Sequence, residues 1–180
     1  LVSPKNNHSP ELRIFDSKGN LLRSFLAYPE SFQHGFSISM SDVDGDGSQD
    51  IITAPNQGGG PQVRMFRTDG SLIGQFFAFK QDFRGGIDVT AEDIDGDKKL
   101  EIFISSGSYM LAWRHDGTPL PGWPQRAYFV EDDVVYTADM DLPVIGDVDG
   151  DGDNEVVAMA FRSIGIYPGG RYVNLNVQKL

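Results

Sequence analysis

Residues 36–66 read FSISMSDVDGDGSQDIITAPNQGGGPQVRMF, and the pattern of this segment indicates the fold class. Its first six residues alternate between apolar side chains and serine, the period of two that is typical of a strand. An acidic loop, an apolar segment at 51–54 and a glycine-rich connection lead to a further strand-like segment at 62–67. The pair Asp69-Gly70 is a hairpin signal, and another apolar segment follows at 72–79. The stretch therefore predicts one sheet of four antiparallel strands.

The same pattern recurs along the chain. A shift of 51 residues aligns 12–51 with 63–102 without a gap, and it matches Arg13 with Arg64, for example. A third and looser copy follows, with an insertion that begins at Trp123. A period of about 50 residues is typical of propellers and solenoids, and four antiparallel strands per period make a propeller blade. We therefore predict an all-β fold built from β-propeller blades.

These repeats suggest how the chain is organised. Because the first copy supplies only the third and fourth strands of a blade, it is expected to be a half blade that completes a sheet begun elsewhere. Propellers have about four to eight blades, so three full blades and one half predict part of a larger propeller, or one completed by other copies. The expected segments are a polar N-terminal leader at 1–10, propeller repeats over 11–180, the half blade at 11–29, and blades at 35–79, 86–125 and 139–178.

Half of the 26 acidic residues lie in three nine-residue loops, DVDGDGSQD, DIDGDKKLE and DVDGDGDNE, which begin at residues 42, 93 and 147. Each loop has acids at positions 1, 3, 5 and 9. In a tightly wound loop these side chains and the position-7 carbonyl converge on one point, and glycine at positions 4 and 6 permits the positive φ that such winding needs. The carboxylates would repel one another without a cation, and an oxygen cage of this kind suits Ca²⁺ better than Mg²⁺. The loops therefore predict three Ca²⁺ sites, the second being the weakest because Lys98 replaces the position-6 glycine.

An EF-hand shares the opening spacing of these loops, but it requires a bidentate Glu at position 12 and helical flanks. Position 12 is Thr53, Ile104 and Ala158 in the three loops, and the segment before the first loop has strand periodicity. The EF-hand interpretation is therefore excluded.

The succession of strand, DxDGDGxxD loop, strand and glycine-rich turn resembles the FG-GAP or VCBS repeats of integrin-alpha-type β-propellers, over residues 11–170. The resemblance implies that the ion loops lie on one face and that partner-binding loops lie on the other, here 28–35, 56–60, 80–86 and Tyr109. It also implies backbone ligation at position 7. The implied ligands are Asp42, Asp44, Asp46, Ser48 (backbone) and Asp50 for the first ion, Asp93, Asp95, Asp97, Lys99 (backbone) and Glu101 for the second, and Asp147, Asp149, Asp151, Asp153 (backbone) and Glu155 for the third.

Composition excludes several functional classes. The formal net charge of −11 repels phosphate backbones, so no nucleic-acid partner is expected. No apolar run approaches the roughly 18 residues that a membrane span needs, so no membrane insertion is expected. Cysteine is absent, which excludes disulfides and thiolate chemistry. His8, His34 and His115 are interpreted as surface residues, and no GxSxG, HExxH or Walker pattern marks a catalytic site.

Three functions remain open at this point. The leading prediction is an extracellular or cell-surface module that binds a protein or glycan and is stabilised by Ca²⁺. The second is a structural subunit of a surface layer or filament, in which the partners are further copies of the chain. The third is a catalytic or non-catalytic part of a polysaccharide lyase or hydrolase, for which the sequence offers no paired acid and base.

Overall fold

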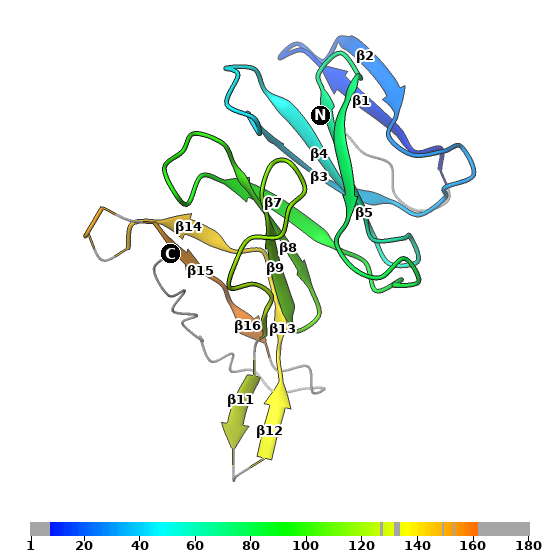
Figure 1. Ribbon diagram of the computed structural model, residues 1–180. Coiled ribbons are helices and arrows are strands. Elements are labelled where there is room, and N and C mark those ends of the chain that lie inside the picture. Colours follow the sequence, from blue (N-terminus) through cyan, green and yellow to red (C-terminus); the bar gives the residue numbers. More distant parts are fainter. Residues whose placement is uncertain (1–7, 127, 132–133, 149, 153, 162–180) are drawn as a thin grey trace. The chain divides into compact units, whose positions relative to one another are not determined.

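The computed structural model describes residues 8–126, 128–131, 134–148, 150–152 and 154–161 of the chain. These residues form strands, turns and loops without a helix (Figure 1). Consequently the described part offers no helix long and apolar enough to cross a membrane. The predicted all-β class with four-stranded antiparallel sheets is confirmed.

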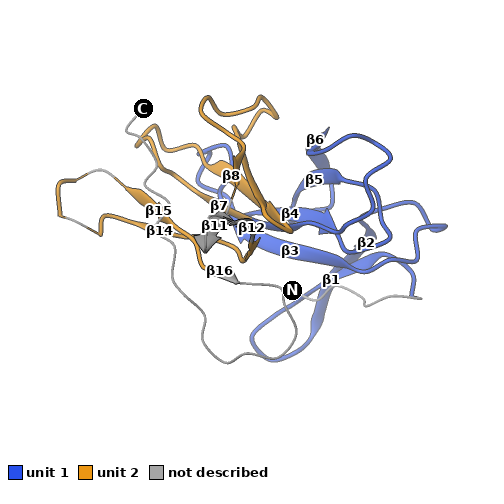
Figure 2. Cartoon of the chain, turned by 90° about the horizontal axis from the view of Figure 1, so that it is seen from below, with its two compact units in different colours: residues 1–89 blue, residues 90–180 orange. Residues whose placement is uncertain are grey.

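The chain divides into two compact units, Leu1–Val89 and Thr90–Leu180 (Figure 2). Strand β7 (Asp88–Glu92) spans the boundary between them. Unit 1 contains β1 (Glu11–Phe15), β2 (Leu21–Leu26), β3 (Phe36–Ser41), β4 (Asp50–Pro55), β5 (Gln62–Arg67) and β6 (Leu72–Phe77). Unit 2 contains β8 (Glu101–Ser106), β9 (Tyr109–Trp113), β10 (Gln125–Arg126), β11 (Tyr128–Glu131), β12 (Val134–Thr137), β13 (Asp139–Met140), β14 (Val144–Gly146), β15 (Glu155–Val157) and β16 (Ala160–Phe161).

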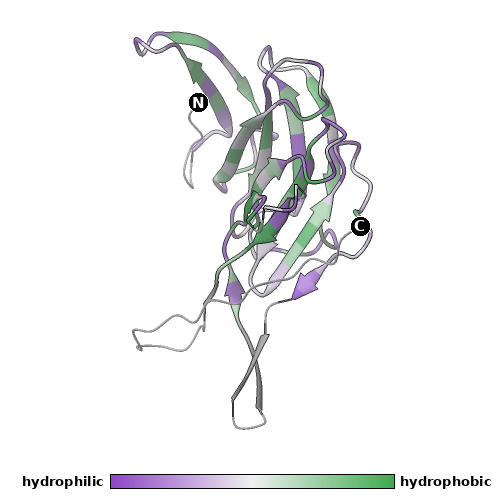
Figure 3. Cartoon of the chain, turned by 90° about the vertical axis from the view of Figure 1, so that its left-hand side faces the viewer, coloured by the Kyte–Doolittle hydropathy of each residue, from purple (hydrophilic) through white to green (hydrophobic). Residues whose placement is uncertain are grey.

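The central sheet of unit 1 has the strand order β3-β4-β5-β6, and every neighbouring pair is antiparallel. Strand β4 is buried along its whole length, Asp50 and Thr53 included, while β3, β5 and β6 contain partly exposed positions. Hydrophobic and hydrophilic residues follow one another in bands along the strands of the chain (Figure 3). The turn between β5 and β6 is held by Asp69, whose Oδ1 accepts the N–H of Ser71 at 2.8 Å. Gly70 takes a φ of +90° there, which is why the turn requires glycine.

Strands β1 and β2 form a two-stranded antiparallel sheet that packs against the four-stranded sheet of unit 1. The shared core includes Leu12, fully buried, and Phe66, whose ring lies 5.2 Å from that of Phe25. Arg64 adds a polar link across the two sheets, because its guanidinium donates to the Ala27 carbonyl at 2.6 Å. Phe25 and Phe66 therefore serve the packing between these two sheets.

Unit 2 contains a second four-stranded antiparallel sheet, with the order β10-β9-β8-β7. Its fourth strand is only two residues long. The three prolines of the segment 118–124 that leads to it lack an N–H to donate, so this segment pairs with β9 only locally, through a bridge between Trp113 and Pro119 and a hydrogen bond from the Leu120 N–H to the Ala112 carbonyl at 2.9 Å. Buried Phe103 and Met110 lie in the core of this unit, and Trp123 of the insertion packs edge-on against Phe103 with ring centroids 5.4 Å apart.

The rest of unit 2 consists of strand pairs. The hairpin β11–β12 was not indicated by the repeat pattern, whereas β14 and β15 flank the third acidic loop as expected. Strand β13 pairs with β16. Much of the blade predicted at 139–178 lies outside the described residues, which end at residue 161.

Candidate metal centres

Each acidic loop joins two antiparallel strands in the same way. The first connects β3 to β4, the second connects β7 to β8, and the third connects β14 to β15. Position 1 directly follows the last residue of the first strand, and position 9 is the first residue of the second strand. Because the ladder pairs Ser41 with Asp50 and Gly146 with Glu155, positions 1 and 9 are held close together. The strands therefore fix the two ends of every loop.

The position-1 aspartate winds the loop around its own carboxylate. In each loop both carboxylate oxygens accept backbone N–H groups from further along the loop. The donors to Asp42 are Asp46 (3.0 Å) and Gly47 (2.8 Å), those to Asp93 are Gly96 (2.8 Å) and Lys98 (3.0 Å), and those to Asp147 are Gly150 (2.6 Å) and Gly152 (3.1 Å).

The position-9 acid closes the loop from the other end. Its carboxylate accepts the N–H of position 2, from Val43 to Asp50 at 3.1 Å, from Ile94 to Glu101 at 3.2 Å, and from Val148 to Glu155 at 3.0 Å. Asp50 and Glu101 have exposed fractions of 0% and 1%. A buried carboxylate is costly unless it is hydrogen-bonded or paired with a cation.

The backbone takes positive φ at positions 4 and 6 in all three loops. At position 6, Lys98 adopts a φ of +70°, against +89° for Gly47 and +96° for Gly152. Lys98 is the one non-glycine residue with positive φ among the described residues. The lysine therefore preserves the winding of the second loop, at a backbone strain of about 1–2 kcal/mol.

Three of the predicted ligands converge in each of the first two loops. The carboxylates of Asp42, Asp44 and Asp50 each offer an oxygen within 4.8 Å of the others, and so do those of Asp93, Asp95 and Glu101. These oxygen donors fit a hard divalent cation, and both groups could hold a metal ion.

The other predicted ligands are placed differently. The position-5 acids lie outside the two converging groups, and they accept the N–H of position 7, from Ser48 to Asp46 at 2.8 Å and from Lys99 to Asp97 at 2.7 Å. Ligation by the Ser48 and Lys99 carbonyls remains a prediction. In the third loop, Asp149 and Asp153 lie outside the described residues, while Asp147, Asp151 and Glu155 lie within them.

The first and second loops differ in their electrostatics. Burial raises the pKa of Glu101 to about 7, and the neighbouring acids Asp95, Asp97 and Asp93 add to the effect. In the first loop, hydrogen bonds from Arg67 lower the pKa of Asp44. Burial raises the pKa of Asp50, although the contact with Arg67 opposes that rise. The second loop therefore has an uncompensated buried acid, whereas the first has a cationic neighbour.

Arg67, the last residue of β5, is a member of the first site that sequence reasoning missed. Its Nη2 lies 2.7 Å from Asp44 Oδ2 and 3.0 Å from Asp46 Oδ2, and its Nη1 lies 2.8 Å from Asp50 Oδ1. The signal was available in principle, because the ladder pairs Asp50 with Arg67 and so places both side chains on one face of the sheet.

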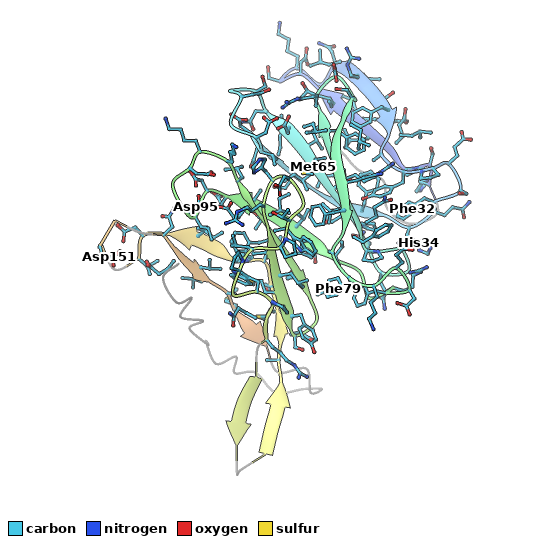
Figure 4. The ribbon with its side chains drawn as sticks, in the orientation of Figure 1. Phe32, His34, Met65, Phe79, Asp95 and Asp151 are labelled. Carbon is cyan, nitrogen blue, oxygen red and sulfur yellow. The ribbon has the colours of Figure 1, made fainter. Side chains whose placement is uncertain are left out.

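Three of the segments expected to bind a partner lie together at the other end of the β3–β6 sheet. The Asn56 N–H donates to the Gly35 carbonyl at 2.8 Å, and the Gly58 N–H donates to the Arg84 carbonyl at 2.9 Å. Phe32 and His34, labelled in Figure 4, have ring centroids 5.6 Å apart. We call the segments 28–35, 56–60 and 80–86 the loop cluster.

Comparison with known protein families gives a match that covers the first two acidic loops. A family model described as an FG-GAP-like repeat matches residues 42–104, a stretch that contains the first two acidic loops and the β3–β6 sheet beyond β3. No curated protein matches the chain, and no solved structure does. Residues 42–104, from the first acidic loop into β8, are therefore similar to an FG-GAP-like repeat, the family that the DxDGDG loops resemble.

Proposed function

We propose that this chain is a Ca²⁺-stabilised β-propeller module of an extracellular or cell-surface protein, and that it binds a protein or glycan partner. The FG-GAP-like repeat suggests a propeller-type binding or adhesion module. The proposal that the chain binds Ca²⁺ rests on the convergence of three carboxylates within 4.8 Å in each of the first two loops. Sites of this kind in extracellular modules bind Ca²⁺ with dissociation constants of about 10⁻⁴–10⁻³ M.

The role proposed for Ca²⁺ is structural. Each loop joins two neighbouring strands, and each ends in a carboxylate that caps the loop from the start of the second strand. A bound cation would offset the repulsion among the clustered acids and so hold the strand ends together. Ions bound only by the folded state stabilise it by mass action.

We propose the loop cluster as the partner-binding surface. Strand β4 runs from the first acidic loop at Asp50 to the cluster at Asn56, and six strand residues span about 17–20 Å. The ion therefore lies far from the proposed contact and supports it through the sheet. Exposed polar side chains, Gln33 and Gln57 among them, are available in the cluster.

The calcium part is tested by thermal unfolding in EDTA, in millimolar CaCl₂ and in MgCl₂ at the same ionic strength. We expect Ca²⁺ to raise the melting temperature by several degrees over EDTA, since a stabilisation of 1 kcal/mol shifts Tm by about 2–4 °C in a chain of this size. Mg²⁺ should have a smaller effect because it requires stricter octahedral geometry. Equal melting temperatures in EDTA and Ca²⁺ would contradict the structural role.

The partner part is tested by binding of the labelled chain to a glycan array and to intact cells. The matched variant carries Gln33→Ala and Gln57→Ala, two changes of exposed side chains that leave the acidic loops intact. Loss of binding in this variant supports the loop cluster as the contact. Binding that persists unchanged places the contact elsewhere.

One observation favours the structural-subunit alternative. The β1–β2 sheet has only two strands in the described part of the chain, so an edge of β1 is left without a neighbouring strand. Such an edge is a template for pairing with another chain. Concentration-dependent filaments in electron micrographs would support this alternative, whereas monomers at all concentrations would count against it.

A further inference from the structure

We propose that Arg67 serves as an internal cation of the first acidic loop and makes this loop a weaker Ca²⁺ site than the second. The inference rests on the proposed function in one respect, namely that the loops bind Ca²⁺ at all. It goes beyond that function because it names the residue that determines which of the first two loops binds Ca²⁺ more tightly. It also reverses the order expected from Lys98 alone.

The guanidinium of Arg67 engages the carboxylates that would hold the ion. It forms ion pairs with Asp44, Asp46 and Asp50 at 2.7, 3.0 and 2.8 Å. The Arg67 side chain is only 29% exposed, and Asp50 is fully buried. Charged hydrogen bonds of this kind are stronger than neutral ones, and they are screened less when they are partly buried.

The position of Arg67 is set by the sheet and not by a chance surface contact. The β4–β5 ladder pairs Arg67 directly with Asp50. Asp50 then has both oxygens engaged, since Oδ2 accepts the Val43 N–H at 3.1 Å while Oδ1 accepts from Arg67. A cation that uses Asp44 and Asp50 must therefore first displace the guanidinium.

The second loop has no such occupant. Arg114 stands at the matching point of the chain, where its N–H donates to the Thr118 carbonyl at 2.8 Å, as that of Arg67 donates to the Ser71 carbonyl at 2.9 Å. Among the described residues, however, no ion pair joins Arg114 to the second loop, and Glu101 accepts only the Ile94 N–H.

The lysines of the second loop do not replace Arg67. Lys98 and Lys99 have exposed side chains, and within the described part of the chain neither forms an ion pair with the loop acids. Lys98 also keeps the positive φ of the glycines at position 6, so the second loop retains its winding. A divalent cation therefore meets three carboxylates there without a competing cation held among them.

The test is a CaCl₂ titration of the ¹⁵N-labelled chain, followed by NMR at the assigned glycine amides. Gly45 and Gly47 report the first loop, Gly96 reports the second, and Gly150 reports the third. The variants are Arg67→Gln, Arg67→Lys and the matched control Arg114→Gln. Thermal unfolding of each variant in EDTA and in CaCl₂ provides a second measurement.

We expect Gly96 to reach its titration midpoint at a Ca²⁺ concentration about tenfold below that of Gly45 and Gly47, a free-energy difference of about 1.4 kcal/mol. Arg67→Gln should remove this gap and make the melting temperature more dependent on Ca²⁺. Arg67→Lys should fall between Arg67→Gln and the unchanged chain, because an ammonium cannot bridge three carboxylates as the planar guanidinium does. Arg114→Gln should leave all midpoints within about twofold, the scale of a surface charge effect.

Equal midpoints at the first and second loops, unchanged in Arg67→Gln, would overturn the proposal while leaving the proposed function intact. An Arg67→Gln variant that stays unfolded in millimolar CaCl₂ would also overturn the proposal, since Ca²⁺ would then be unable to take the place of the guanidinium. If no loop glycine responds to Ca²⁺ in any variant, the proposed function fails instead.

Discussion

Glu101 links burial, loop closure and charge in a single side chain. Its carboxylate caps the second loop by accepting the Ile94 N–H at 3.2 Å, yet it is 1% exposed and surrounded by three aspartates. In the metal-free protein its charged form is therefore costly, which is why its pKa rises to about 7 from an ordinary value of 4.5. A bound cation would reverse this balance, because it favours the charged form.

The raised pKa of Glu101 predicts how stability depends on pH without divalent ions. Since the folded protein holds this proton more tightly than the unfolded chain, stability should fall as the pH rises from 4.5 to about 7. The loss is at most about 3 kcal/mol. Glu101→Gln removes the titration, so in EDTA the variant should gain stability over the unchanged chain across that window, as measured by urea unfolding. A stability difference that does not vary with pH would contradict the assignment. In excess Ca²⁺ the variant should be the less stable chain.

The strain at Lys98 predicts a stabilising substitution. Lys98→Gly removes the positive-φ penalty, and Lys99→Gly is the matched control because it makes the same change of charge and side chain one residue away. In excess Ca²⁺ we expect Lys98→Gly to be more stable than Lys99→Gly by about 1 kcal/mol in urea unfolding. Equal stability would mean that the lysine is not strained in solution.

At the scale of the elements, close backbone approaches hold the loop cluster together. Gly86 has a φ of +83°, and a Cβ placed on it would lie 2.5 Å from the backbone nitrogen of Gln57. No other residue could bring segments 80–86 and 56–60 so close. The cluster is therefore a packed surface whose segments support one another, rather than three independent loops.

Gly86→Ala tests this packing, with Gly19→Ala as the matched control. Gly19 has nearly the same φ, +84°, but an added Cβ meets nothing within 4 Å. Both variants should lose about 1 kcal/mol from backbone strain. Gly86→Ala should lose about 1–3 kcal/mol more in urea unfolding, because backbone must shift to relieve the overpacking. Equal losses of unfolding free energy in the two variants would show that segments 80–86 and 56–60 separate at little cost.

The sequence allowed the strands of unit 1 to be predicted closely, and the reasons are specific. Segments predicted at 36–41 and 62–67 coincide with β3 and β5, because alternation, turn residues and a gapless internal repeat all agree there. The β11–β12 hairpin and the short β10 were missed, since no repeat supports them. Arg67 was missed for another reason: its ion pairs depend on cross-strand register, which local patterns do not reveal.

Across the molecule, negative charge is concentrated in the three loops that connect neighbouring strands. Thirteen of the 26 acids lie in the three loops, and the formal net charge is −11. Three Ca²⁺ ions would bring it to −5, since each adds two positive charges. Self-repulsion destabilises compact states of high net charge, so the metal-free chain should be stabilised by any means of screening.

This reasoning predicts a salt dependence that changes with Ca²⁺. In EDTA, monovalent salt should raise the melting temperature, because the Debye length falls to about 10 Å at 0.1 M and the loop acids are then partly screened from one another. In excess Ca²⁺ the same salt should have a smaller effect, since the loops are neutralised at close range. NaCl and choline chloride at equal ionic strength separate screening from Na⁺ binding in the loops. If salt fails to stabilise the metal-free chain, repulsion does not open the loops, and Ca²⁺ would act by fixing loop geometry alone.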